Sequence, residues 1–264
     1  YRVWESITGG IPGASWYPNS PDLTKGTLGD RSIINQLAHS FTDSTIAIVG
    51  TNDGNVQFGF NLNQGTANTA TWVNVTDNNQ VLPNRPVLDV VTHATVPTTG
   101  YAVVGGFDQN TPDQPGHIFE VTCNADCSSF TWANKSGNLP NIPANSVMVN
   151  PNYPSQVFVG TDWGLYFTND ISAASPEWFH FTAGVPNVMI WDMTVDHGYT
   201  TLALFTRSRG AYAWPLPDSP IPTSVQVSEL STEAGNSVPW LLVSLAGLTS
   251  IAALAWVGAR RRRS

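Results

Sequence analysis

Few residues of this chain have the types and spacing that catalysis requires. Asp192, Asp196 and His197 form the most catalytic-looking group, near the end of an expected strand. A glycosidase would need two carboxylates about 5 to 9 Å apart, and no motif marks such a pair. The five histidines are scattered, with no His-Glu-x-x-His sequence and no serine or cysteine partner pattern. We therefore expect turn and strand-face roles for Asp192, Asp196 and His197, and we predict no catalytic residue.

The two cysteines, Cys123 and Cys127, stand in the sequence Cys-Asn-Ala-Asp-Cys between two strand-like runs. Such a close pair fits a small disulfide in an oxidising compartment, and two reduced thiols are the alternative. No second Cys or His pair stands at the ligand spacing of a zinc site. Asp108 and Asp113 could offer oxygen ligands to Ca²⁺, but their spacing is not that of a standard calcium loop. The sequence predicts neither a metal site nor a cofactor.

The structural element that would position these residues is clearest in residues 145–182. Four short apolar runs in this stretch alternate with period two, are rich in β-branched and aromatic residues, and are separated by Asn-Pro, Asp and Ser-Pro positions. That pattern predicts a four-stranded antiparallel sheet. A single sheet of this kind cannot bury both of its faces, so it needs neighbours of the same type.

Two markers of this sheet recur along the chain. A Trp that opens the expected last strand of each copy is followed by an apolar-Pro step, at Trp4, Trp72, Trp132 and Trp178. Between them, tight Gly/Asp turns close apolar strands at residues 49–54, 104–108, 159–164 and 206–210. Such turns are typical of hairpins. Because the spacing varies only in the loops, the markers indicate one repeated sheet.

The repeats predict an all-β fold, a β-propeller of about four four-stranded blades. Residues 1–8 would form a lone fourth strand, whereas residues 191–217 supply three strands without a fourth. We expect the N-terminal strand to complete that last blade and close the ring, which leaves no open sheet edge. Residues 1–217 are thus predicted to be one extracytoplasmic propeller. Because the chain begins at Tyr1 rather than Met, a longer natural precursor is expected.

The composition changes after residue 217. Residues 218–237 are rich in Pro, Ser and Thr, and we predict an extended linker there. Residues 238–259 contain no charged side chain and are long enough to cross a bilayer as one α-helix. Trp240 and Trp256 would lie near the two interfaces of this transmembrane helix. The basic tail, residues 260–264, would be cytoplasmic by the positive-inside rule, on account of Arg260, Arg261, Arg262 and Arg263.

The predicted span also offers a contact surface to another helix. Ser244, Gly247 and Ser250 recur at helical spacing, and small residues let helices approach closely. We therefore expect a bacterial inner-membrane protein that crosses the bilayer once and holds its propeller on the periplasmic side. Its expected partners are the lipid bilayer and other integral membrane subunits.

The charge argues against nucleic acid as a partner. The net charge is −8, and residues 1–237 carry seven basic and nineteen acidic side chains, because four of the eleven basic residues lie in the tail. A surface with this balance repels phosphate backbones.

The sequence Gly160-Thr-Asp-Trp-Gly-Leu-Tyr-Phe-Thr-Asn-Asp170, the Asp-containing turns before each Trp, and the later Arg-Gly-Ala-Tyr-Ala-Trp at residues 209–214 resemble the BNR/Asp-box family of β-propellers. That family includes sialidase-like enzymes, sortilin-type receptors and photosystem assembly factors. The resemblance covers about residues 1–217. No copy of the usual Ser-x-Asp-x-Gly-x-Thr-Trp box is intact. Two copies are partial: Asp126 precedes Thr131-Trp132, and Asp170 precedes Trp178 with extra residues between them. The resemblance implies a propeller and leaves the activity open.

Sialidase-like members of that family clamp a substrate carboxylate with three arginines. Outside the tail this chain offers Arg2, Arg31, Arg85, Arg207 and Arg209. Arg207 and Arg209 belong to one expected turn, and nothing in the spacing brings three of the five together. The resemblance therefore does not carry a catalytic site over to this chain.

Together these features predict a non-enzymatic scaffold or binding propeller anchored in a membrane. We expect an accessory subunit that stabilises a larger bacterial membrane complex, and the family resemblance implies a photosynthetic or respiratory host. Loop aromatics, namely Trp16, Tyr17 and Trp163, would contact the partner. The alternative is a sialidase-like or other glycan-active or glycan-binding protein of the cell surface.

Overall fold

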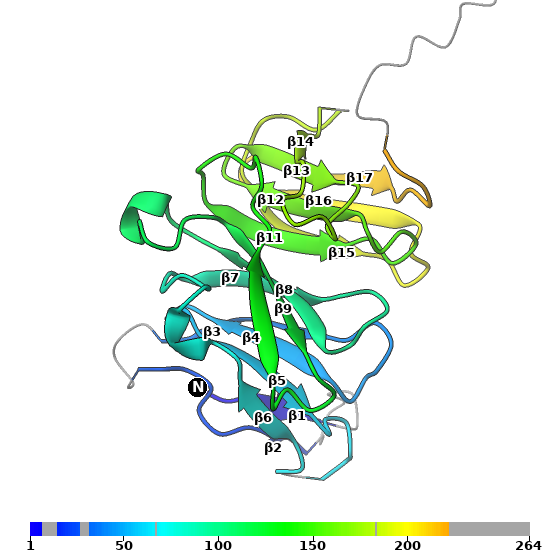
Figure 1. Cartoon of the computed structure of the whole chain (residues 1–264). Coiled ribbons are helices and arrows are strands. Elements are labelled where there is room, and N and C mark those ends of the chain that lie inside the picture. Colours follow the sequence, from blue (N-terminus) through cyan, green and yellow to red (C-terminus); the bar gives the residue numbers. More distant parts are fainter. Residues whose placement is uncertain (7–14, 27–31, 67, 183, 222–264) are drawn as a thin grey trace, which may run out of the picture. The chain divides into compact units, whose positions relative to one another are not determined.

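The computed structural model describes residues 1–6, 15–26, 32–66, 68–182 and 184–221. These residues form antiparallel sheets that follow one another along the chain (Figure 1). The first complete sheet contains β3 (Ile34–His39), β4 (Ala47–Thr51), β5 (Val56–Phe60) and β6 (Thr71–Asn74). The second contains β7 (Val87–Thr92), β8 (Thr99–Val104), β9 (Ile118–Cys123) and β10 (Phe130–Asn134). The third contains β11 (Ala144–Val149), β12 (Val157–Thr161), β13 (Gly164–Thr168) and β14 (Phe179–His180).

Two smaller sheets stand at either end of this series. The fourth sheet has three strands, β15 (Ile190–Val195), β16 (Thr201–Thr206) and β17 (Gly210–Pro215). The N-terminal sheet has two short strands, β1 (Trp4–Glu5) and β2 (Tyr17–Pro18). Two 3-10 turns, η1 (Asp77–Asn79) and η2 (Asp108–Asn110), lie in the loops after β6 and β8. The all-β prediction and the four-bladed propeller are confirmed.

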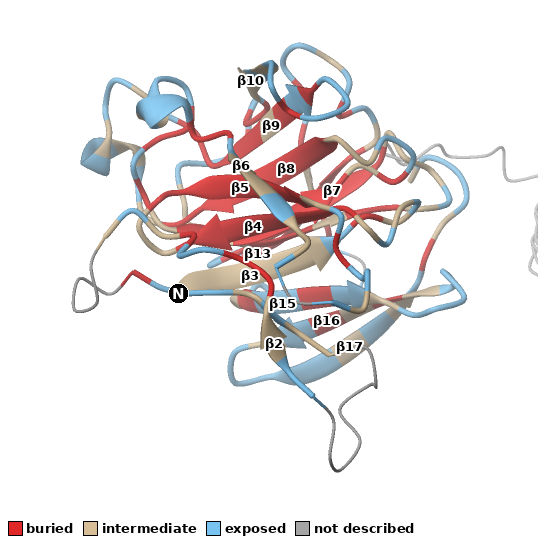
Figure 2. Cartoon of the chain, turned by 90° about the horizontal axis from the view of Figure 1, so that it is seen from below, coloured by how far each residue is buried: buried red, intermediate tan, exposed pale blue. Residues whose placement is uncertain are grey.

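Alternation of side chains along each strand places the core between neighbouring sheets. Three buried clusters join the first sheet to the second, the second to the third and the third to the fourth. Phe58 and Phe119 belong to the first of these clusters, and Phe158 and Leu204 to the third. Between the fourth sheet and the first, Phe41 and Tyr199 make an edge-to-face contact with ring centroids 6.2 Å apart. Strands β4, β5 and β8 are buried, whereas β17 is largely exposed (Figure 2).

The first strand of every blade carries the same irregularity. The pairing register of β3, β7, β11 and β15 with the next strand shifts by one residue near its start. Such a bulge inserts one residue and re-aims the side chains beside it. The residues that follow the inserted positions are polar in all four blades: Gln36, Asp89, Ser146 and Asp192.

The repeated Trp is a link between blades. Indole Nε1 of Trp132 donates to the carbonyl of Val75 (2.6 Å), and that of Trp178 donates to the carbonyl of Lys135 (2.9 Å). Each acceptor stands three positions after the Trp of the preceding blade, Trp72 or Trp132. The sequence pattern therefore marks the contact that holds one sheet to the next.

An equivalent hydrogen bond shows that the sequence analysis assigned the first copy of the repeat to the wrong Trp. Indole Nε1 of Trp72 donates to the carbonyl of Asn19 (2.8 Å). Asn19 stands three positions after Trp16, not after Trp4. Trp16 thus occupies the repeat position that the sequence prediction gave to Trp4, and β1 and β2 correspond to the last two strands of a blade.

The predicted closure of the ring by the N-terminal strand is wrong. Trp4 and Glu5 pair with Pro18 and Tyr17, not with β17. The N-terminal amine lies 2.6 Å from the Asp22 carboxylate, and the amide of Leu23 donates to the carbonyl of Tyr1 (3.0 Å). These local bonds hold β1 to the segment that follows it in the chain.

That segment in turn lies against the first sheet, because Gln57 Nε2 and Asn55 Nδ2 both donate to the Leu23 carbonyl, at 2.9 and 2.7 Å. Beyond β17 the chain turns back toward the third sheet. The amide of Ile221 donates to Asn169 Oδ1 (3.0 Å), and Asn169 Nδ2 donates to the Ile221 carbonyl (2.7 Å). Among the described residues, no strand pairs with the outer edge of β17.

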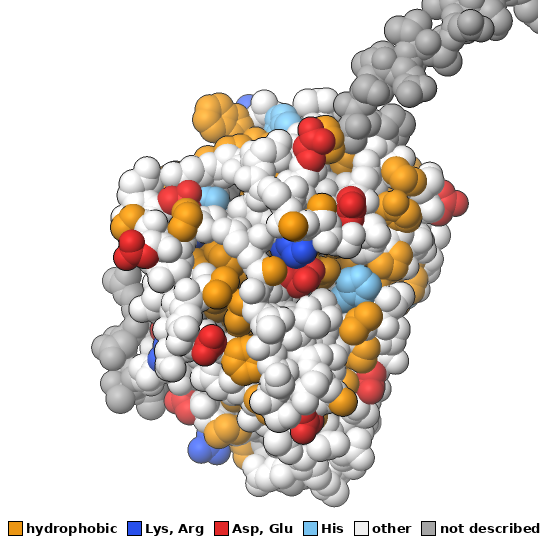
Figure 3. Space-filling view, viewed as in Figure 1, with side chains coloured by type: hydrophobic (Ala, Val, Ile, Leu, Met, Phe, Trp, Pro, Cys, Tyr) orange, Lys and Arg blue, Asp and Glu red, His pale blue; other side chains and the backbone are white. Residues whose placement is uncertain are grey.

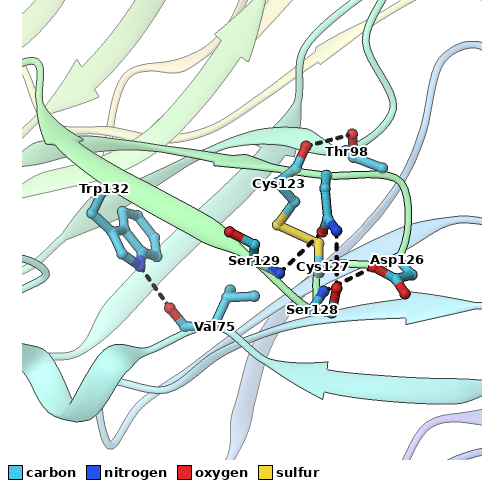
Figure 4. The surroundings of a disulfide bond; sticks show 9 residues. Val75, Thr98, Cys123, Asp126, Cys127, Ser128, Ser129 and Trp132 are labelled. Carbon is cyan, nitrogen blue, oxygen red and sulfur yellow. Dashed lines mark hydrogen bonds between the residues drawn. A yellow bond between two sulfur atoms is a disulfide. The ribbon is translucent and has the colours of Figure 1, made fainter.

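The predicted disulfide is present in the structure. Cys123 and Cys127 are bonded, with Cα atoms 4.8 Å apart, in the turn between β9 and β10 (Figure 4). Hydrogen bonds from the amides of Ser128 and Ser129 to the side chains of Asp126 and Asn124 brace the same turn. The close spacing along the sequence was a sufficient signal, because a hairpin turn brings its two ends together.

Loss of this disulfide should destabilise the chain only moderately. For so short a loop the chain-entropy model gives about 2 kcal/mol, and the braced turn remains. Chemical denaturation of the Cys123→Ala/Cys127→Ala variant, compared with the wild type in dithiothreitol, measures this cost. The variant and the reduced wild type should lose the same stability relative to the oxidised wild type, and a wild type whose stability dithiothreitol leaves unchanged would contradict the disulfide.

The C-terminal predictions fall on residues that the structure does not describe. The span at 238–259, with Trp240, Ser244, Gly247, Ser250 and Trp256, and the arginines at 260–263 all lie outside the described residues. In the part that is described, no helix has the length and hydropathy of a membrane span. The compact unit that contains the blades runs from Tyr1 to Ile221.

Candidate binding face and axial cluster

The inner strands of the four blades begin on one side of the propeller, here called the loop face. Asn35 Nδ2, at the start of β3, donates to the carbonyl of Val87 at the start of β7 (2.8 Å). A Cβ on Gly160, at the end of β12, would meet Ile190 at the start of β15. The turns β4–β5, β8–β9, β12–β13 and β16–β17 also end on this face, because neighbouring strands are antiparallel.

Each blade exposes at least one large apolar side chain on the loop face. Ile33 (42% exposed) precedes β3, Phe107 (47%) lies in the β8–β9 loop, Trp163 (63%) in the β12–β13 turn, and Trp191 (62%) is the inserted residue of the β15 bulge. On the side of the molecule shown in Figure 3, most charged groups lie apart, and one basic group near the centre lies against an acidic group. Exposed aromatic side chains in surroundings of low charge are typical of protein interfaces.

The predicted contact residues fall in different places. Trp163 lies on the loop face as described. Trp16 is also exposed (59%), but it precedes β2 and belongs to the N-terminal sheet. Tyr17 is half-buried in β2, and its hydroxyl is buried without a hydrogen-bond partner among the described residues. Trp191, which was not among the predicted contact residues, joins Trp163 on this face.

A cluster of Arg85, Asp108 and His117 supports the β8–β9 loop. Arg85, 3% exposed, donates to the carbonyl of Gly116 and lies 3.8 Å from Asp108 Oδ1. Burial lowers the pKa of Arg85, and the charge of Asp108 partly offsets this. His117 lies 3.5 Å from Asp108 Oδ1, but burial and the nearby Arg85 lower its pKa, so the ring is neutral at pH 7. Asp108 therefore balances the guanidinium and anchors the loop through the amide of Gly116 (2.7 Å).

These contacts engage Oδ1 of Asp108, one of the two carboxylates considered for a calcium site. Within the described part of the chain, no three His, Cys, Asp or Glu side chains are grouped as metal ligands would be. Of the catalytic-looking group, Asp192 lies within β15, and Asp196 and His197 directly follow that strand. Asp196 accepts bonds from the amides of Gly198, Thr200 and Thr201 and so stabilises the β15–β16 turn, as predicted.

The described arginines do not form a carboxylate clamp. Arg85 is buried, whereas Arg207 and Arg209 are exposed in the β16–β17 turn. Arg31 lies outside the described residues.

Asp89 sits at the axis where the inner strands meet. Its Oδ1 accepts the amide of Val90 (2.7 Å), and its Oδ2 accepts the amide of Val147 from the third blade (2.8 Å). Burial raises the pKa of Asp89 to about 7, against the hydrogen bonds from Val147, Gln36 and Val90, and the charge of Asp192 raises it further. This carboxyl group thus interacts with all four blades, and no sequence motif marked it.

A polar cavity of about 510 Å³ opens beside the link between β6 and β7. Amide side chains dominate its lining, together with one lysine, one aspartate and one phenylalanine. Sequence reasoning named none of these residues as a site. The available signal was the run Asp77-Asn-Asn-Gln80, which reads as a turn and gives no indication of the distant residues that complete the cavity.

No protein-family model and no curated protein sequence matches the chain. Among solved structures, the chain is similar to the β-propeller domain of Cps50 (Swd1) from Myceliophteria thermophila, with a TM-score of 0.47 and 10% identity over 70% of this chain. The match covers 53% of that domain, so the chain spans about half the length of the structure it matches. The successive four-stranded blades make the chain a β-propeller, and its resemblance to the BNR/Asp-box family stays a prediction.

Proposed function

We propose that the chain is a non-enzymatic binding propeller, an accessory subunit that stabilises a larger bacterial membrane complex. The observation that supports this most directly is the row of exposed apolar side chains on the loop face, Ile33, Phe107, Trp163 and Trp191, one from each blade. Such residues act as binding anchors when a partner covers them. Among the described residues, no three His, Cys, Asp or Glu side chains are grouped as metal ligands would be.

The membrane part of the proposal rests on the sequence. Residues 238–259 have the length and composition of a single span, and Arg260 to Arg263 would keep its end cytoplasmic. Ser244, Gly247 and Ser250 would face a helix of the host complex. The propeller would then stand on the periplasmic side and present its loop face to a photosynthetic or respiratory assembly, the hosts that the BNR/Asp-box resemblance implies.

The test combines extraction and mutation. Native mass spectrometry of the detergent-extracted complex should show the chain bound to other membrane subunits. The Trp163→Ala/Trp191→Ala variant should retain its fold and lose binding by about tenfold or more, because aromatic anchors dominate interface energies. Trp4→Ala is the matched control, since Trp4 is exposed (55%) but lies outside the loop face. A solely monomeric protein that turns over glycosides would contradict the proposal.

A further inference from the structure

The cavity beside the β6–β7 link has a wall of side chains that are held rigid by one another. Asn74 Nδ2 and Thr76 Oγ1 both donate to Asn55 Oδ1, at 3.0 and 2.6 Å. Asn55 Nδ2 donates to the carbonyl of Leu23 (2.7 Å), so the N-terminal segment fixes the same wall. A wall whose polar groups are already oriented can bind a polar ligand at little cost in conformational entropy.

Lys25 extends along another side of the cavity. Its Nζ donates to Asn79 Oδ1 (2.5 Å) and Asn84 Oδ1 (3.2 Å), and its backbone amide is held by Asp53 Oδ2 (2.7 Å). Both partners of the ammonium group are neutral amides, and no ion pair to Lys25 is formed among the described residues. The ammonium group has three donor hydrogens, so one remains for a ligand.

The rim of the cavity is backbone in an unusual conformation. Asp77, Asn78 and Asn79 are consecutive residues with φ of 52°, 49° and 59°. Asn and Asp tolerate this left-handed region better than other non-glycine residues, but three in succession are costly, and strain of this kind concentrates at binding sites. The Asn78 side chain is exposed and makes no hydrogen bond to the described residues, so its donor and acceptor groups are free.

The charge and polarity of the lining select a class of ligand. Lys25 supplies a donor and Asp77 an acceptor, and their charges balance, so an anion such as phosphate gains nothing over a neutral molecule. Amide side chains can donate and accept at once, which matches neighbouring hydroxyl groups. Phe130 gives the lining one apolar surface, and the volume of about 510 Å³ lies in the range of small-molecule sites.

We propose that this cavity binds a neutral saccharide, which hydrogen-bonds to Lys25, Asp77 and Asn78 and packs one sugar face on Phe130. The site would only bind, because Asp77 is the one carboxylate in the lining and glycoside hydrolysis requires two. This inference stands apart from the proposed membrane assembly, since it uses none of the exposed apolar residues of the loop face.

Isothermal titration of the full chain in detergent tests the proposal. The probes are glucose, galactose, mannose, N-acetylglucosamine and their common disaccharides, with inorganic phosphate as the anionic comparison. At least one saccharide should bind at micromolar to millimolar concentration, and phosphate should not compete. Absence of saccharide binding, or phosphate binding at the same site, would overturn the proposal.

Two variants locate the binding in this cavity. Asn78→Gly removes the side chain but suits the left-handed backbone, so the loop should fold. Lys25→Met keeps the length of the side chain and removes the donor. Each should weaken saccharide binding by about tenfold, the effect of losing one or two polar contacts. Asn187→Ala is the matched control, because Asn187 is exposed in the equivalent link between the third and fourth blades and does not line the cavity. Equal loss in the control, or none in the two variants, would refute the site.

Discussion

The stability of the folded chain should fall as the pH rises from about 5 to about 8, because of Asp89. Burial raises the pKa of this carboxyl group in the folded state from 3.8 to about 7. Between these values the unfolded chain has lost the proton that the folded chain still holds, so raising the pH favours unfolding. A difference of about three pKa units corresponds to about 4 kcal/mol, lost progressively between the unfolded pKa and the folded pKa. Urea denaturation at a series of pH values measures the slope.

The Asp89→Asn variant should abolish that slope. Its amide oxygen can accept from only one of Val90 and Val147, and its amino group then faces the other donor, so the variant should also be less stable at pH 5. Asp192→Asn should lower the pKa of Asp89 and move the slope to lower pH, because the charge of Asp192 contributes to the rise. An unchanged slope in Asp89→Asn would show that another group titrates.

The acidic groups of the surface act in a different pH window. Hydrogen bonds from Thr45 lower the pKa of Asp43, and bonds from Thr201 and Thr200 lower that of Asp196. Their contribution is present above the ordinary carboxyl pKa and is lost as the pH falls below it. Asp43→Asn is therefore the control, which should keep the slope between pH 5 and 8.

Replacement of Trp178 by Ala should cost about 3 to 5 kcal/mol of folding stability, the usual effect of removing a buried aromatic ring. Trp178 is 4% exposed and packs in the cluster that joins the second and third blades. Its indole Nε1 also donates to the Lys135 carbonyl, and its backbone amide donates to Asn138 Oδ1 (2.6 Å). Guanidinium denaturation with tryptophan-independent circular dichroism measures the loss.

Two further substitutions separate the loss of the hydrogen bond from the loss of buried apolar surface. Trp178→Phe keeps most of the apolar surface but leaves the Lys135 carbonyl without its donor, which should cost about 1 to 3 kcal/mol. Trp163→Ala, at an exposed site, should change stability by no more than about 0.5 kcal/mol. If Trp178→Ala and Trp163→Ala had similar effects, the Trp178 side chain would not be the link between blades that the hydrogen bonds indicate.

The blades themselves could be predicted because their signals are local. Period-two alternation and Gly/Asp turns determine each hairpin within a few dozen residues, and residues 145–182 showed all of them at once. The disulfide was predictable for the same reason, since four positions and a hairpin turn separate Cys123 from Cys127. The repeated Trp was also visible, although its role as a hydrogen-bond donor to the preceding blade was not.

What only the tertiary structure decided depends on residues that are distant in sequence. The sequence analysis paired the N-terminal strand with the last blade, whereas β1 pairs with β2. Either neighbour could satisfy the backbone groups of β1, and local bonds at Asp22 and Leu23 favour β2. The raised pKa of Asp89 requires the amide of Val147, far along the chain, and dense packing around the carboxyl group. The cavity needs Lys25, Asn78 and Phe130 from three separate segments. A sequence pattern determines which residues form strands and turns, whereas burial and charge at a site depend on which of those strands become neighbours.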